Sequence, residues 1–323
     1  MSGVRKLHWG ALLLAGLATL AVTACKTTPG PDPRYKPSEG VLEVVTVLRR
    51  HVPDDTYHFP PAQDFTGRNV YRSSLLRLES LETLHGETLH ASHMEGVVIF
   101  AKGRALERLQ AYPLAGAQYS LAADLDSELA VEALRSADLC QALDDATAIG
   151  VGLDELAEQE GLETDADGML TLFERRISRL EAVAQQADGT HHVYVVMEEV
   201  ERADVARAEY FVGLRQILPD GDVRAAAELE RLVVRHGDSK NGNRHVLALA
   251  GLYEDLAVEY VDANPPESLY FDPVRFQELI DATSRLYEVV ANQDGRPEKL
   301  EASRKLEAFL AFALRVDRDR FTR

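Results

Sequence analysis

The sequence predicts an all-α fold in which helical hairpins repeat along the chain. Through most of the 323 residues, apolar side chains recur at the spacing of one helix face. No segment shows the convincing alternation of apolar and polar residues that a half-buried strand requires. Long amphipathic helices joined by short turns bury their apolar faces by packing side by side. The polar turns expected in the second half are 188–189, 219–221, 237–242, 264–273 and 293–297.

The first 24 residues predict a secretory signal that is cleaved from the mature chain. Arg5 and Lys6 form a basic start, and the apolar run that follows over 11–22 is too short to span a membrane well. Small residues then lead up to Cys25. The leader therefore lies outside the fold.

The end of this leader, Val22-Thr23-Ala24-Cys25, resembles the lipobox of bacterial lipoproteins. The resemblance implies that Cys25 carries fatty acyl chains such as palmitate and becomes the new N-terminus. Lys26 stands where an aspartate would resemble an inner-membrane retention signal, which favours the outer membrane with a periplasm-facing body; exposure at the cell surface is the other orientation. The alternative is ordinary cleavage after Ala24, which leaves Cys25 as a free or disulfide-bonded thiol.

The remainder of the chain is strongly acidic. The leader holds two of the 35 basic residues and none of the 53 acidic ones, so 33 basic residues remain and the mature net charge is −20. This charge argues against nucleic-acid partners and against electrostatic adhesion to anionic lipid, so the acyl chains would anchor the protein. If Cys25 is acylated, Cys140 has no cysteine partner, and its apolar helical context predicts a buried, inert thiol.

Composition divides the chain into five parts. These are the leader 1–24, a tether 25–40, an N-terminal helical region 41–149, an acidic connector 150–168 and a C-terminal helical region 169–323. Four prolines predict that the tether is extended and solvated, and the glycines and acids of the connector mark a boundary. The ranges expected to be helical are 40–51, 69–84, the hairpin 96–127, 128–149, 169–186, 191–218, 222–236, 243–261, 274–292 and 298–315.

The hairpin at 96–127 has the clearest pattern. An apolar stripe at helical spacing predicts its first helix: Val97, Phe100, Leu106 and Leu109. Pro113 suits the first turn of a new helix, so the chain turns back just before it. In the second helix Ala115, Tyr119 and Ala122 share one face, and small residues around a large one let two helices approach closely.

Residues 96–129 resemble a tetratricopeptide repeat, a TPR-like helical hairpin that stacks into an α-solenoid or α-α superhelix. The residues that carry the resemblance are Gly103, Ala115, Tyr119 and Ala122. Lys102 and Ser127 depart from the expected apolar residue and closing proline, and Ser127 is placed to cap the next helix. The resemblance implies a groove for extended peptides or partner helices, which Arg104, Glu107 and Arg108 would face. Ordinary solvated helix charges are the alternative.

An acidic stretch at 163–174 resembles a twelve-residue EF-hand loop with Gly168 at its sixth position. The candidate calcium ligands are Glu163, Asp165, Asp167, the Met169 carbonyl, Thr171 and Glu174. Glu163 departs from the aspartate expected at the first position. The alternative is a solvated acidic turn whose Asp165 or Asp167 caps the following helix.

Two weaker candidates involve histidines. His85, Glu87, His90 and His93 could ligate zinc, but their spacing matches no recognised pattern and exposed turn histidines explain them better. The pair His191-His192 is weaker still, since it lies at a helix start. The sequence shows none of the glycine-rich, nucleophile-elbow or zinc-protease motifs of common enzyme classes.

Taken together, these features predict a lipid-anchored envelope protein that acts as a non-catalytic scaffold or assembly factor. Its expected partners are envelope or outer-membrane proteins, with the membrane contacted through the lipid and no nucleic acid bound. No cofactor is expected apart from the calcium of the 163–174 interpretation. A calcium-responsive envelope module is the alternative function.

Overall fold

A computed structural model describes residues 36–51, 55–149 and 165–320. The described part is all-α, as predicted: it contains eleven helices and no strand, only an isolated bridge between Gln63 and Asn69. The predicted leader, the lipobox-like segment with Cys25 and the candidate calcium ligand Glu163 lie outside the described residues. None of the described helices is long and apolar enough to cross a membrane.

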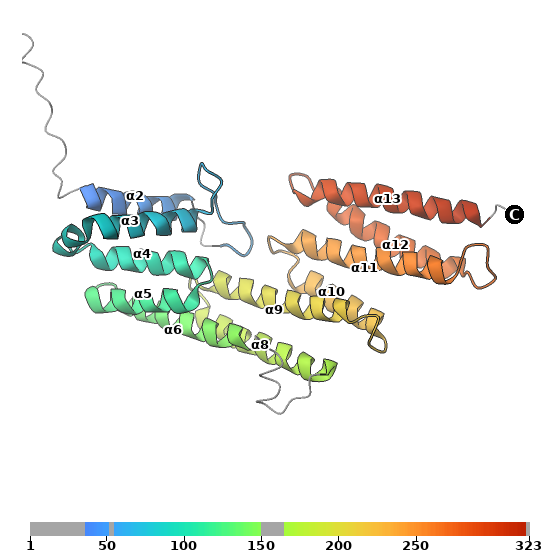
Figure 1. Cartoon of the computed structure of the whole chain (residues 1–323), viewed down its shortest axis with the longest axis horizontal. Helices are drawn as coiled ribbons and strands as arrows, with labels where there is room; N and C mark the ends of the chain where they lie inside the picture. The colour runs from blue at the N-terminus through green and yellow to red at the C-terminus, as the bar shows by residue number, and fades with distance from the viewer. Residues whose placement is uncertain (1–35, 52–54, 150–164, 321–323) are drawn as a thin grey trace, which may run out of the picture.

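The helices follow one another with short connections. They are α2 (Lys36–His51), α3 (Val70–Ala91), α4 (Glu95–Arg108), α5 (Tyr112–Leu125), α6 (Ala130–Ala148), α8 (Ala166–Ala187), α9 (Val193–Gly213), α10 (Gly221–Arg235), α11 (Gly242–Ala263), α12 (Pro273–Ala291) and α13 (Glu298–Asp319). Each helix packs mainly against the one before and the one after it, so the chain forms an array in sequence order (Figure 1). Such an array has a long surface relative to its core.

Several boundaries differ from the sequence prediction. The helix expected at 69–84 continues to Ala91, with a kink where His85 adopts φ −136°, so the predicted histidine-rich turn is largely helical. The helix expected at 191–218 ends at Gly213. The prediction that Ser127 caps the next helix is wrong, because the Asp126 carboxylate accepts the N–H of Glu128 at 2.9 Å instead.

Two helices begin inside segments that the sequence assigns to the tether and the connector. Helix α2 begins at Lys36, inside the range 25–40, and α8 begins at Ala166, inside the range 150–168. Proline at position 37 falls in the first turn of α2, where a missing N–H costs nothing. Helical structure therefore extends further into both segments than their composition suggests.

The hairpin of α4 and α5 packs as its sequence predicts. Tyr119 is fully buried, and a Cβ built on Gly103 would lie 2.9 Å from its ring. Ala115 and Ala122 are also fully buried, and Pro113 lies in the first turn of α5. Only glycine at position 103 lets the two helices approach this closely.

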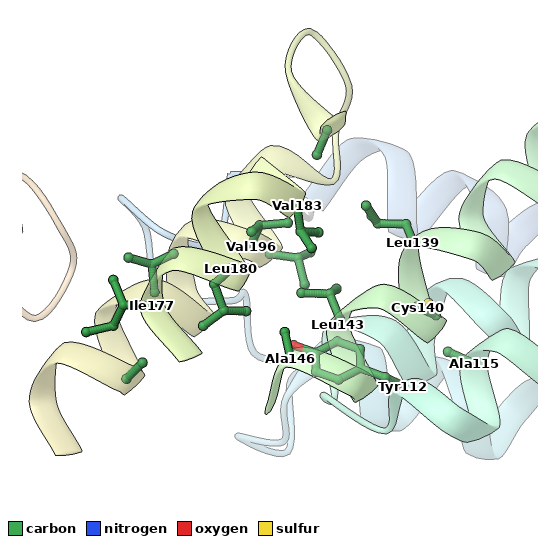
Figure 2. Close-up of a cluster of buried hydrophobic side chains, with 14 of the residues drawn as sticks. Tyr112, Ala115, Leu139, Cys140, Leu143, Ala146, Ile177, Leu180, Val183 and Val196 are labelled. Atoms are coloured by element: carbon green, nitrogen blue, oxygen red, sulfur yellow. The ribbon is translucent and has the colours of Figure 1, made fainter. Parts of the chain in front are cut away.

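One apolar cluster joins the two predicted helical regions. Tyr112 of α5 and Leu143 of α6 pack in the same cluster as Leu180 of α8 and Val196 of α9 (Figure 2). Cys140 lies in this cluster and is fully buried, as predicted, and burial raises the pKa of its thiol. The connector between α6 and α8 therefore does not separate two independent cores.

Candidate functional site

Glu107, one of the three residues predicted to face a groove, is fully buried at the C-terminal end of α4. The Tyr119 hydroxyl donates a hydrogen bond of 2.8 Å to its Oε2. His192 Nδ1 lies 3.2 Å from the same oxygen, without the alignment of a hydrogen bond. Glu107 thus belongs to the interior of the array and does not line an open groove.

The neighbouring Arg108 is held in the same interior. Its side chain is 1% exposed, and its Nε lies 3.8 Å from Glu107 Oε1. The guanidinium donates to the hydroxyl of Thr56 at 3.2 Å and to the backbone carbonyl of His191 at 3.1 Å. Arg104 is partly exposed and lies near enough to influence the pKa values of Glu107 and His191. The segment carrying His191 and His192 packs over this end of α4. The sequence of the α4–α5 hairpin alone cannot predict this contact.

The pKa values of Glu107 and His191 are both shifted from their ordinary values in this buried network. Burial alone raises the pKa of Glu107, but the contact with His192 and the charges of His192, Arg104 and Arg108 outweigh burial and lower the pKa to about 2. Burial, together with the nearby arginine charges, lowers the pKa of His191 to about 3. At neutral pH the carboxylate is therefore ionised and the His191 imidazole is neutral.

A second polar network connects the segment before α3 to the far half of the array (Figure 1). The Tyr57 hydroxyl is hydrogen-bonded to His236 Nδ1 at 2.9 Å, and His236 Nε2 to Asp204 Oδ2 at 2.9 Å. The backbone N–H of Lys240 donates to the Tyr57 carbonyl at 2.8 Å, and the Lys240 ammonium donates to the Thr56 carbonyl at 2.6 Å. The sequence predicts that the segment before α3 is irregular and is held in place by its aromatic residues. Tyr57 is 3% exposed and makes this contact.

A third network lies beside the second and closes the turn before α11. Glu201 of α9 accepts a hydrogen bond from the Ser239 hydroxyl at 2.5 Å and lies 2.6 Å from His245 Nε2. Burial raises the pKa of Glu201, but these two partners lower it by more. Two of the buried acids of α9 are thus paired with histidines, Asp204 with His236 and Glu201 with His245, whereas the third, Glu199, accepts a hydrogen bond from the Tyr112 hydroxyl.

The candidate calcium residues occupy a helix start. Asp165 is the N-cap of α8, and its carboxylate accepts the N–H of Gly168 at 2.8 Å. The remaining described candidates lie within α8 itself: Asp167, Met169, Thr171 and Glu174. This is the arrangement that the capping alternative predicts. Because Glu163 lies outside the described residues, the calcium interpretation stays a prediction.

The histidines near the start of α4 lie at the surface. His90 Nδ1 is 2.5 Å from Glu95 Oε2, and the His90 side chain is 76% exposed. His93 is exposed and has φ 58°, the left-handed backbone of a tight turn. Both side chains are exposed, as the exposed-turn alternative of the sequence analysis requires, but His90 belongs to the last turn of α3 and only His93 lies in the turn.

An open groove of about 640 Å³ runs along helices α10, α11 and α12. Its floor is apolar and its rim carries acids, with these lining residues: Asp222, Val223, Ala226, Ala227, Glu230, Tyr253, Leu256, Glu259, Tyr260, Ala263, Asn264, Arg275 and Leu279. The Arg275 guanidinium lies 5.6 Å from the centre of the Tyr260 ring. The sequence analysis singled out none of these residues, since an exposed helix face has no distinctive local pattern.

Arg215 fixes the acids at one end of the groove. Its guanidinium donates to Asp222 at 3.0 Å and forms a bidentate pair with Glu259. Glu230, at the rim, is exposed and accepts a hydrogen bond of 2.9 Å from Tyr253. The groove therefore combines an apolar floor with at least one carboxylate that keeps acceptor capacity.

The described residues form an all-α array of helices packed in sequence order, with an open groove along α10–α12. No protein-family model matches the chain, and no similar curated protein was found.

Proposed function

We propose that this chain is a lipid-anchored protein of the bacterial envelope that acts as a non-catalytic scaffold or assembly factor. In this proposal Cys25 carries the lipid, the body stacks TPR-like hairpins, and partner proteins bind to the surface of the array. The lipid confines that surface to the membrane, which raises its effective concentration for membrane-associated partners.

The observation that carries the proposal is the groove along α10–α12. Its apolar floor, with Leu256 and Leu279, offers contact area, and exposed Glu230 adds negative charge at the rim. Helical-repeat proteins bind helices or extended segments in such concave surfaces, with apolar pockets giving affinity and charges giving register. The charge of the rim favours a partner segment that combines apolar side chains with lysine or arginine.

The proposal is tested by blocking the groove without disturbing the helix. Ala227 of α10 is exposed and lines the groove, and arginine is a good helix former, so Ala227→Arg adds bulk and positive charge there. Ala311→Arg makes the same change on an exposed position of α13 and serves as the control. Partners are recovered by crosslinking in membranes and identified by mass spectrometry.

We expect Ala227→Arg to lose partners that the parent chain and Ala311→Arg both retain. If the same partners crosslink to all three forms, the groove is not the binding surface. The anchor is tested separately by intact mass of the mature protein. An acylated Cys25 at the N-terminus supports the proposal, and a mature N-terminus without acyl chains contradicts it.

A further inference from the structure

Three side chains from distant parts of the sequence meet inside the array with ligand atoms directed toward one another. Glu107 comes from the end of α4, whereas His191 and His192 come from the segment between α8 and α9. One carboxylate oxygen and one nitrogen from each imidazole all lie within 4.8 Å of one another. Among the described residues this is the one such group of three.

Polar atoms on the same three side chains also lack the hydrogen bonds that buried polar atoms normally have. Glu107 Oε1, His191 Nε2 and His192 Nδ1 are each buried and have no hydrogen-bond partner among the described residues. Most buried polar side-chain atoms in proteins are paired, so three unpaired atoms in one place indicate a missing partner. That partner must accept lone pairs from imidazole and carboxylate together.

We propose that Glu107, His191 and His192 bind one divalent transition-metal ion of the zinc class, with water completing the coordination. Two imidazoles and a carboxylate are ligands that such ions favour. Tetrahedral zinc with bonds of about 2.0–2.1 Å places its ligand atoms about 3.3 Å apart. The 3.2 Å between His192 Nδ1 and Glu107 Oε2 is already close to that spacing.

The orientation of two of the ligands suits a metal. Ser136 Oγ lies 3.3 Å from His192 Nε2, which leaves Nδ1 of that ring for the ion. The Tyr119 hydroxyl orients the Glu107 carboxylate from the other side.

The site lies next to an open pocket. This pocket of about 500 Å³ between α6 and the end of α8 has His192 in its lining. Asp138 and Thr190 line the same pocket and give it polar walls. Glu107 and His191 do not line it, so the ligand atoms themselves are buried.

Two arginines oppose the ion and limit its affinity. Arg104 and Arg108 lie close enough to lower the pKa of His191. The Arg108 guanidinium is directed toward Thr56 and the His191 carbonyl, both of which accept its hydrogen bonds. We therefore expect weaker binding than at a cysteine-rich structural zinc site.

The consequence of binding would be a cross-link between the two helical regions. The ion would join α4, in the N-terminal region, to the segment that leads into α9. A ligand that binds only the folded chain raises its thermal midpoint. This role is independent of the groove on α10–α12 and of partner binding there.

The test is a titration of the metal-free full chain with Co²⁺, whose visible absorption reports tetrahedral coordination, followed by displacement with Zn²⁺. His191→Phe keeps an aromatic ring and removes a ligand nitrogen that has no hydrogen-bond partner, so the variant should fold. Glu107→Gln keeps the shape and an acceptor for Tyr119. A control combining His90→Ala and His93→Ala removes the exposed histidines near the start of α4.

We expect one equivalent of Co²⁺ to give the tetrahedral spectrum and Zn²⁺ to raise the midpoint of the parent chain and of the His90/His93 control. Both effects should be lost in His191→Phe and Glu107→Gln. Far-UV circular dichroism of each variant before titration checks that it is helical. Absence of the spectrum in the parent chain overturns the proposal. Survival of the spectrum in folded His191→Phe, or its loss in the control, also overturns it.

Discussion

Replacing Gly103 by alanine tests whether the contact between α4 and α5 is as tight as the geometry indicates. Alanine in a helix interior is favoured over glycine by about 1 kcal/mol. At position 103, however, the new Cβ would lie 2.9 Å from Cδ1 and 3.0 Å from Cε1 of Tyr119. The ring cannot move aside easily, since it is fully buried, packs edge-on against Phe100 and is hydrogen-bonded to Glu107.

Gly251 provides the matched control. It lies in the middle of α11, and a Cβ there would meet nothing within 4 Å. Gly251→Ala should therefore keep the propensity gain of about 0.5–1 kcal/mol. Forcing a methyl into a packed site costs about 1–3 kcal/mol, so Gly103→Ala should be less stable than Gly251→Ala by about that amount.

The assay is thermal unfolding of both variants followed by circular dichroism at 222 nm. A difference of 1 kcal/mol moves the midpoint by about 2–4 °C in proteins of 150–250 residues, so the two midpoints should separate clearly. If Gly103→Ala raises the midpoint as much as Gly251→Ala does, the close packing of α4 on α5 is refuted.

Three further predictions concern the buried network and the start of α8. Tyr119→Phe removes the donor to Glu107 Oε2 and should destabilise the chain by about 1–3 kcal/mol in urea unfolding, because the carboxylate stays buried. The pKa of His191 is lowered from 6.5 to about 3 in the folded chain, so the unfolded chain binds the proton more tightly. The free energy of unfolding should therefore decrease as the pH falls below about 6.5. The decrease should be smaller in His191→Phe. Asp165→Ala removes the bond to the Gly168 N–H and should cost about 1 kcal/mol in thermal melts, with or without millimolar calcium.

Each of these has a control or a contradicting outcome. Tyr253→Phe removes a hydroxyl that serves an exposed carboxylate and should change stability less than Tyr119→Phe; equal losses would contradict the buried network. An unchanged pH profile in His191→Phe would mean that another group sets the acid sensitivity. A midpoint that calcium raises in the parent chain and not in Asp165→Ala would favour the calcium interpretation of 163–174 over the cap.

The helices and the α4–α5 hairpin were predictable because they depend on residues that lie close together in the sequence. The periodicity of apolar residues predicted nearly every helix, and the small and large residues around Tyr119 predicted how α4 and α5 meet. Those patterns lie within one hairpin, where the helical period alone decides which side chains share a face. The predicted leader, residues 1–24, rests on an equally local pattern and stays a prediction, because it lies outside the described residues.

The buried networks were not predictable in the same way. In the sequence of an isolated helix, Glu107 looks like an ordinary exposed charge and His191-His192 looks like a weak ligand candidate at a helix start. Arg108 and His191 are 83 positions apart, and Tyr57 and His236 are 179 apart. No periodic pattern connects residues at such separations, because the contact between them depends on how all the intervening helices stack.

The sequence by itself determined the helical class, the order of the helices and the pairing of one hairpin, since each depends on neighbouring residues along the chain. Only the tertiary structure decided which charges are buried. Glu107 became an interior carboxylate, and Glu230 became part of an exposed groove, because stacking successive helices covers one face of the array and leaves another open. The candidate metal site and the candidate partner surface both follow from that division.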